Sequence, residues 1–278
     1  MIKGLKALHP YTEPVGHTIR EQTIDAFQGA KGTVRIYTPN ELPKPAKTIA
    51  YLHGGGWTIG DLDSEDAVCR LLCTETKSVI VSIDYRKAPE NPFPVPLEDA
   101  WAGVLWATVL TQRARDIGTV SFRGLILRNP MVCHPDAHPQ DLNFDSYIEN
   151  KDAALLPAAA VHNFVGFYNP PPNDNRFSSL LTEDLTGLPP SYIQVSGADP
   201  LRDDGIHYAR KLENASLYTK GGTIGQAYPF KVLPGVQMTQ KPFCQRTVKI
   251  TMPRAEKFKS GSEQVSKSAG SVTRPVLT

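Results

Sequence analysis

The stretch Tyr51-Leu-His-Gly-Gly-Gly-Trp-Thr-Ile-Gly60 decides how the rest of this sequence is interpreted. The apolar run over 48–52 predicts a short buried strand, which His53 and three glycines end abruptly. Because glycines put no side chain in the way, their N–H groups can turn toward one point and stabilise the negative oxygen of a tetrahedral acyl-transfer intermediate. For an isolated glycine triplet, the alternative is a tight strand-to-loop turn. The stretch therefore predicts either a turn or an oxyanion hole.

The complete string His53-Gly-Gly-Gly-Trp57 is more specific than its glycines alone. It resembles the signature of the hormone-sensitive-lipase-like esterases, a branch of the α/β-hydrolases. The resemblance implies that Gly54 and Gly55 donate the oxyanion hydrogen bonds and that His53 and Gly56 support the loop. It also implies an α/β-hydrolase fold, with a mostly parallel sheet and helices on both faces.

A second string supports the same resemblance. Asp84-Tyr-Arg-Lys-Ala-Pro-Glu90 begins about thirty residues after the glycines and resembles the segment that follows the same strand in this family. Its residues indicate a supporting loop, because Arg86 can pair with carboxylates and proline restricts the path of the chain. Two strings in register argue against a chance match.

Local patterns agree with an α/β arrangement. The alternating segment 33–37 predicts a half-buried strand, and the Val- and Ile-rich segment 78–83 predicts a strand buried in a parallel sheet. Asp63-Ser-Glu-Asp66 suits the start of a helix, which would complete a strand-helix-strand unit. The apolar segment 155–168 predicts a helix with Pro157 in its first turn. In the family such a helix lies over the acyl pocket, and burial in the core is the alternative.

A carboxylate follows a later predicted strand, Ser191–Val195, in the string Ser196-Gly-Ala-Asp-Pro-Leu-Arg-Asp-Asp204. The carboxyl ends of parallel strands are where α/β sheets place functional groups. By resemblance, Asp199 is the catalytic acid, which orients a histidine and stabilises its imidazolium. The alternative is that Asp199 caps the helix that follows, with Asp203 and Asp204 favourable to the helix dipole.

The segment that should carry the nucleophile is missing. In the family, the helix ending near Trp106 is followed by a strand, a Gly-x-Ser-x-Gly elbow and another helix. Here Ala107 leads to the segment 111–116, which looks like the far end of that second helix, and no Gly-x-Ser occurs anywhere. The interval from Trp106 to Gly124 is too short for a strand, an elbow and a full helix. We therefore predict that the sheet has lost a central strand.

The histidine base is missing as well. Lys231-Val-Leu-Pro-Gly-Val236 resembles the loop that precedes it, but Gln237 and Met238 follow, and no histidine occurs after His207. A serine without a base is a poor nucleophile, and a base without a serine has nothing to activate. With both absent, we expect no esterase turnover from the chain as written.

Length and composition favour one soluble α/β domain. The chain has 278 residues, of which 40% are hydrophobic and 21% charged, and no apolar run approaches the roughly 20 residues of a membrane span. The absence of a signal-peptide core near the start favours a cytoplasmic protein. Four cysteines are too few for a disulfide scaffold.

The predicted domain boundary lies near residue 238. We predict an incomplete α/β-hydrolase-like domain over 1–238, with cap elements near 140–175, and a basic tail over 239–278 for which disorder is one interpretation. The tail has a net charge of +6, against −4 for the rest of the chain. It lacks interleaved aromatic residues, so we do not expect nucleic-acid binding.

Three interpretations of function remain open. The first is a member of a serine carboxylesterase lineage that cleaves a small, acetyl-type ester. Its sequence motifs most resemble those of fungal members, such as the versiconal hemiacetal acetate esterases of secondary metabolism. The second is a non-catalytic ligand-binding protein, for which the gibberellin receptors, which resemble the family without its base, are a precedent. The third is a decayed or mis-spliced gene product. The expected partner is a small-molecule ester, no cofactor or metal is implied, and the oligomeric state is not indicated.

Overall fold

The computed structural model describes residues 15–103, 112–114, 116–118, 122–217 and 231–233. The chain divides into two units, Met1–Cys244 and Gln245–Thr278, and every described residue belongs to the first. The predicted tail over 239–278 lies outside the described residues. No helix in the described ranges is both long and apolar enough to cross a membrane.

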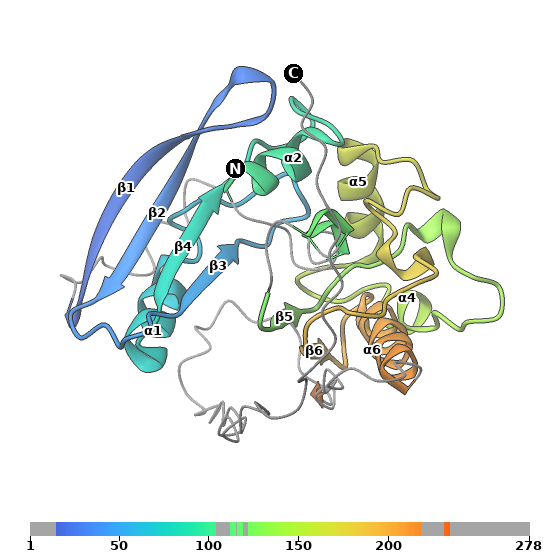
Figure 1. Cartoon of the computed structure of the whole chain (residues 1–278). Helices are drawn as coiled ribbons and strands as arrows, with labels where there is room; N and C mark the ends of the chain where they lie inside the picture. Colours follow the sequence, from blue (N-terminus) through green and yellow to red (C-terminus); the bar gives the residue numbers. More distant parts are fainter. Residues whose placement is uncertain (1–14, 104–111, 115, 119–121, 218–230, 234–278) are drawn as a thin grey trace, which may run out of the picture. The chain divides into compact units, whose positions relative to one another are not determined.

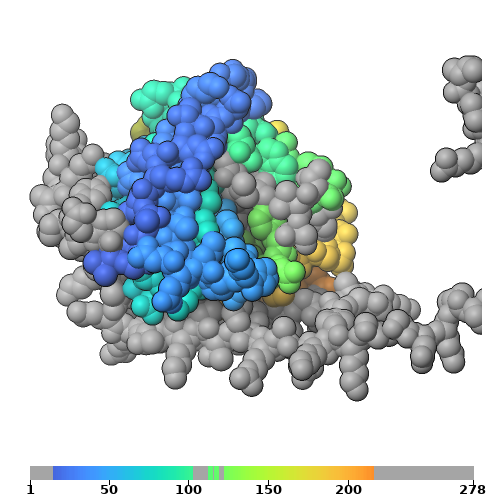
Figure 2. Space-filling model, turned by 60° about the vertical axis from the view of Figure 1, so that its left-hand side comes forward, coloured from blue at the N-terminus to red at the C-terminus, as the bar shows by residue number. Residues whose placement is uncertain are grey.

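The first sheet has the strand order β1-β2-β4-β3. Strands β1 (His17–Asp25) and β2 (Lys31–Pro39) form an antiparallel hairpin, and β2 pairs antiparallel with β4 (Val79–Asp84). Figure 1 shows this hairpin in blue, and Figure 2 shows it, also in blue, at the surface of the molecule. Strand β3 (Thr48–Leu52), predicted with these bounds, pairs parallel with β4.

The predicted strand-helix-strand unit is confirmed. Helix α1 (Asp66–Thr76) joins β3 to β4. Its Cys69 and Cys73 are buried with Tyr37 and Ile80 of the sheet, so both cysteines act as small apolar core residues.

The second sheet is parallel, with the order β5-β6-β7. Its strands are β5 (Leu125–Arg128), β6 (Ser191–Ser196) and β7 (Lys231–Leu233). Helix α6 (Arg202–Leu217) lies against β6, and its Tyr208 is buried in the same cluster as Val195.

The strand order breaks between β3 and β5. Within the described ranges, no strand joins the two sheets, although each contains strands that run parallel. The segment that the sequence lacks would lie between α2 and β5 in chain order. The predicted loss of a central strand stays a prediction, because residues 104–111 and 119–121 of this interval lie outside the described residues.

The remaining helices follow the same chain order. Helix α2 (Val95–Gly103) is described to Gly103, and its predicted end near Trp106 lies outside the described residues. The region predicted to contain cap elements holds α4 (Ser146–Glu149) and α5 (Ala158–Tyr168). Helix α5 begins later than predicted, and Pro157 has extended backbone and is its N-cap, not part of its first turn. The short 3-10 helices are η2 (Phe27–Gly29), η3 (Pro135–Ala137) and η4 (Ser179–Leu181).

Candidate active site

The glycine loop after β3 has an unusual backbone. Three consecutive residues have positive φ angles, 136° at Gly55, 56° at Gly56 and 63° at Trp57. The N–H groups of Thr58 and Ile59 both donate to the Gly55 carbonyl, at 3.1 and 3.0 Å. A Cβ atom at Gly55 would collide with the Ile59 carbonyl, so only glycine fits this turn.

The loop leaves backbone donors unused. The N–H groups of Gly54, Gly55 and Gly56 donate to no backbone acceptor in the described part of the chain. A Cβ atom at Gly54 would meet nothing within 4 Å, so the space in front of this residue is open. These are the properties that binding of a negative oxygen requires, and the assignment of Gly54 and Gly55 as oxyanion donors stays a prediction.

His53 holds the start of the loop. Its side chain is buried, its ring stacks on Tyr85 with centroids 4.3 Å apart, and the Tyr85 hydroxyl donates to the His53 carbonyl at 2.9 Å. His53 Nδ1 lies 2.9 Å from the Gly54 carbonyl, which can only accept, so Nδ1 carries the proton. Burial lowers the pKa of His53, and the imidazole is therefore a neutral support for the loop.

Asp199 lies just past the carboxyl end of β6, as predicted, and is 2% exposed. Its Oδ1 accepts from the Leu201 N–H at 2.8 Å, which is the local contact expected of a capping aspartate. Its Oδ2 is buried without a hydrogen-bond partner among the described residues. Burial raises the pKa of the Asp199 carboxyl. Capping therefore explains one oxygen of Asp199 and leaves the other without a role.

Helix α5 lies against the glycine loop. A Cβ atom at Gly56 would be 2.6 Å from Cγ of Phe164, and the Trp57 and Tyr168 rings stack with centroids 4.9 Å apart. The sequence predicted the helix but gave no sign that Phe164 would contact Gly56, because that contact spans more than a hundred residues of chain.

Arg86 has the supporting role that the sequence indicated. Its guanidinium binds both carboxylate oxygens of buried Asp99, at 2.7 and 2.8 Å, and also donates to the Phe27 carbonyl. Arg86 thus joins the string 84–90 to helix α2, which carries Asp99, and to Phe27, the first residue of η2.

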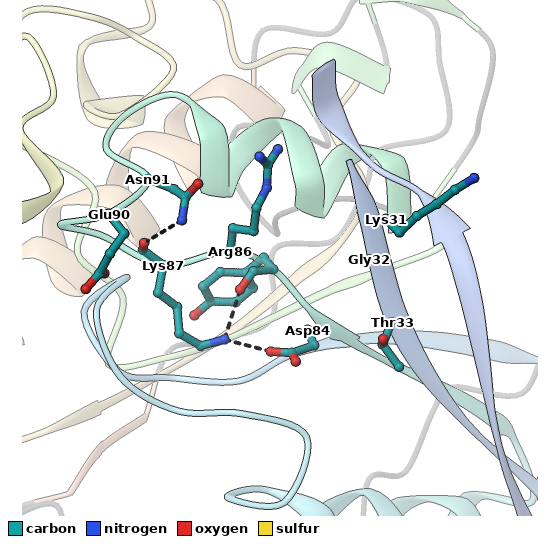
Figure 3. A pocket seen from close by; sticks show the side chains of 9 residues that line it. Lys31, Gly32, Thr33, Asp84, Arg86, Lys87, Glu90 and Asn91 are labelled. Carbon is teal, nitrogen blue, oxygen red and sulfur yellow. Dashed lines mark hydrogen bonds and ion pairs between the residues drawn. The ribbon is translucent and has the colours of Figure 1, made fainter. Parts of the chain in front are cut away.

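A cavity of about 360 Å³ is lined by residues of this string, Arg86 among them, and by the start of β2 (Figure 3). Lys87 Nζ, which points into it, already donates to Asp84 Oδ1 at 2.6 Å and to the Tyr85 carbonyl at 2.9 Å. The Asn91 amide donates to the Lys87 carbonyl. Because Lys87 and Asn91 already bind neighbouring groups of the described chain, we assign no ligand to this cavity.

A glycine loop after one parallel strand and a buried aspartate after another define an α/β-hydrolase type of protein. A model of the α/β hydrolase fold family matches residues 49–108 and 103–220. The chain belongs to this family, in its hormone-sensitive-lipase-like branch. The fold class predicted from the sequence is confirmed.

Two characterised relatives illustrate the similarity. The chain is 35% identical to the esterase LipI of Mycobacterium tuberculosis over 242 residues, which cover 74% of this chain and 72% of LipI. It is 31% identical to the versiconal hemiacetal acetate esterase of Aspergillus parasiticus over 220 residues, 70% of this chain and 69% of that enzyme. The family and these relatives place the chain among esterase-type α/β hydrolases.

Solved structures give the same result. Vibralactone cyclase is similar with a TM-score of 0.70 and 29% identity, covering 81% of this chain and 73% of that one. The thermostable carboxylesterase EstE1, cloned from a metagenomic library, has a TM-score of 0.67 and 27% identity, covering 84% of this chain and 82% of that one.

Gln237 and Met238, where the sequence lacks the expected histidine, lie outside the described residues.

Proposed function

We propose that this chain derives from a serine carboxylesterase and that, as written, it does not hydrolyse esters. The observation that carries the proposal is the absence of a Gly-x-Ser elbow from the sequence. The described strands support it, because they form two separate sheets, β1-β2-β4-β3 and β5-β6-β7. The two matched segments of the family model overlap at 103–108, directly before the interval in which the elbow is missing.

Chemistry supports the second half of the proposal. Acyl transfer needs a nucleophile held against its base and within reach of the oxyanion donors. The glycine loop and Asp199 are the two parts of this arrangement that remain, and neither attacks a carbonyl carbon. An oxyanion hole adds to catalysis only when a nucleophile is positioned in front of it.

For the ancestral substrate we propose a small, acetyl-type ester of fungal secondary metabolism. The support is the similarity to enzymes named versiconal hemiacetal acetate esterase. The contact of α5 with the glycine loop also favours a short acyl group, because Phe164 lies directly against Gly56.

The test is hydrolysis of p-nitrophenyl acetate by the purified full chain. We expect a rate equal to that of the buffer blank. Two variants distinguish the chain from a contaminating esterase. Gly55→Ala places a Cβ atom against the Ile59 carbonyl and should disrupt the loop, whereas the Cβ atom of Gly54→Ala has no atom within 4 Å and should leave the loop intact. Turnover that co-purifies with the chain and is lost only in Gly55→Ala would overturn the proposal.

The origin of the two losses is tested by sequencing the native transcript across the codons for 107–124 and 218–238. A recovered Gly-x-Ser-x-Gly segment and a histidine after 231–236 would make the natural protein a serine esterase. A transcript that reads as this sequence would leave a gene that has lost its catalytic parts.

A second candidate function, non-catalytic binding of a small ester or acid, is favoured by the unused N–H groups of Gly54 and Gly55. These donors suit a carbonyl or carboxylate oxygen. Calorimetric titration with phenyl acetate should then show saturable binding that Gly55→Ala abolishes. Absence of heat in the unmodified chain would eliminate this candidate.

A further inference from the structure

A short helix far away in the sequence binds the turn that carries Asp199. Ser146, the first residue of α4, donates its backbone N–H to Asp203 Oδ2 at 2.8 Å. Its hydroxyl donates to the Pro200 carbonyl at 2.6 Å and accepts the Asp203 N–H at 3.2 Å. Ser146 is completely buried, so water does not compete for these three bonds.

Asn150, the residue after α4, binds the same turn further upstream. Its side-chain amide donates to the Gly197 carbonyl at 3.3 Å and to the Asp199 carbonyl at 3.2 Å. On the outer side, Arg202 pairs with Glu149 at 2.7 Å. The segment 146–150 thus contacts the backbone on both sides of Asp199.

The Asp199 side chain has little else to orient it. Among the described residues, its one hydrogen bond comes from Leu201, two residues along the same turn. The direction of the carboxylate therefore follows from the backbone of the turn, and 146–150 fixes that backbone. Asp203 is itself held: burial raises the pKa of its carboxyl, but the hydrogen bonds from Arg202 and Ser146 outweigh this and keep that pKa below its usual value.

We propose that Ser146 and Asn150 are positioning residues for Asp199, which they hold in a water-free orientation through the turn at 197–203. This inference rests on the proposed role of Asp199 as the inherited catalytic acid. It deepens that role by assigning the support of the acid to a segment about fifty residues earlier in the chain.

Loosening of the turn should change the pKa of Asp199 in one direction. Burial is what raises the pKa of this carboxyl, and no hydrogen bond from a charged group contributes. If the turn loosens, water reaches Oδ2 and the ionised form is solvated again. Loss of the Ser146 or Asn150 contacts should therefore lower the pKa of Asp199 toward its ordinary value.

The chain offers a matched control for Ser146. Ser178 is also completely buried, and its hydroxyl also donates to a proline carbonyl, that of Pro172, at 2.6 Å. It likewise accepts a backbone N–H, that of His134, at 3.0 Å. Ser178→Ala removes the same two kinds of bond as Ser146→Ala, at a place where they do not hold the Asp199 turn.

The experiment follows the carboxyl carbon of Asp199 by NMR in the full chain labelled with ¹³C-aspartate, with the signal assigned by Asp199→Asn. We expect Ser146→Ala and Asn150→Ala to lower the pKa of Asp199 by about one unit or more, and Ser178→Ala to leave it unchanged. If Ser146→Ala does not fold, Asn150→Ala, at a residue that is only partly buried, gives the same comparison.

Equal pKa values in all four proteins, or an equal shift in Ser178→Ala, would overturn the inference and reduce α4 to general support of the fold. Neither result depends on ester hydrolysis. Turnover of p-nitrophenyl acetate would overturn the proposed function and leave this inference standing.

Discussion

Gly56 and Phe164 lie in direct contact, with the position of a Cβ atom on Gly56 only 2.6 Å from Cγ of the Phe164 ring. The contact joins the glycine loop after β3 to helix α5. It explains why the third glycine of the string has no side chain: positive φ and the neighbouring ring both exclude one.

Gly56→Ala should therefore destabilise the protein by about 2–4 kcal/mol, the sum of left-handed backbone strain and overpacking. Urea unfolding measures this effect. In a double-mutant cycle, Phe164→Ala should recover the overpacking part but not the backbone part. Gly54→Ala is the control, and a loss there as large as at Gly56 would contradict the explanation.

Asp204 should make the protein less stable as the pH rises from about 4 to about 7. Burial raises the pKa of this carboxyl from 3.8 to about 7, although the N–H groups of Val132 and Cys133 lower it. The folded state thus keeps a proton that the unfolded state loses near pH 4, so stability is greatest below that pH and falls until about pH 7.

Asp204→Asn should remove this slope while keeping an oxygen for the two N–H groups. The measurement is the free energy of unfolding of both proteins at pH 5 and pH 8, where the variant should gain relative to the parent at pH 8. Asp203→Asn is the control, because the pKa of Asp203 is lowered and its contribution is lost only below about pH 4, so the effect of this substitution should be the same at pH 5 and pH 8. A parallel pH dependence in parent and Asp204→Asn would contradict the assignment.

Arg86→Ala should cost about 3 kcal/mol of stability, because it leaves the buried Asp99 carboxylate without its cation. Arg86→Lys should recover little, since an ammonium group cannot bind both carboxylate oxygens in the same way. The exposed pair Lys77–Glu41 is the control, and Lys77→Ala should cost much less, because solvent screens an exposed ion pair. Thermal and urea unfolding would measure both, and equal losses would contradict the prediction.

Tyr37→Phe should destabilise the junction of β2 with α1. The Tyr37 hydroxyl is buried and donates to Asp66 at 2.7 Å, so its removal should cost about 1–2 kcal/mol. Tyr51→Phe removes a longer bond, 3.1 Å to the partly exposed Glu65, and should cost less. Urea unfolding measures the stability lost in each variant. A larger loss in Tyr51→Phe than in Tyr37→Phe would contradict the prediction.

The sequence located the parts of the candidate site that depend on local chemistry. Strand β3 was predicted with its observed bounds because a five-residue apolar run ended by glycines has few alternatives. Asp199 was placed correctly past a strand because the segment Ser191–Val195 was predicted as that strand. The later start of α5 was missed because Pro157 suits both the first helical turn and the position before it.

By itself, the sequence determined that the chain has a glycine loop, an aspartate just past a later strand, and neither a Gly-x-Ser elbow nor a late histidine, since these are matters of residue identity and order. Only the tertiary structure decided how the described strands pair, that Phe164 lies against Gly56, and that Ser146 binds the Asp199 turn. Strand pairing, burial and the pKa values that burial shifts depend on contacts between residues distant in the chain, and no local pattern specifies those contacts.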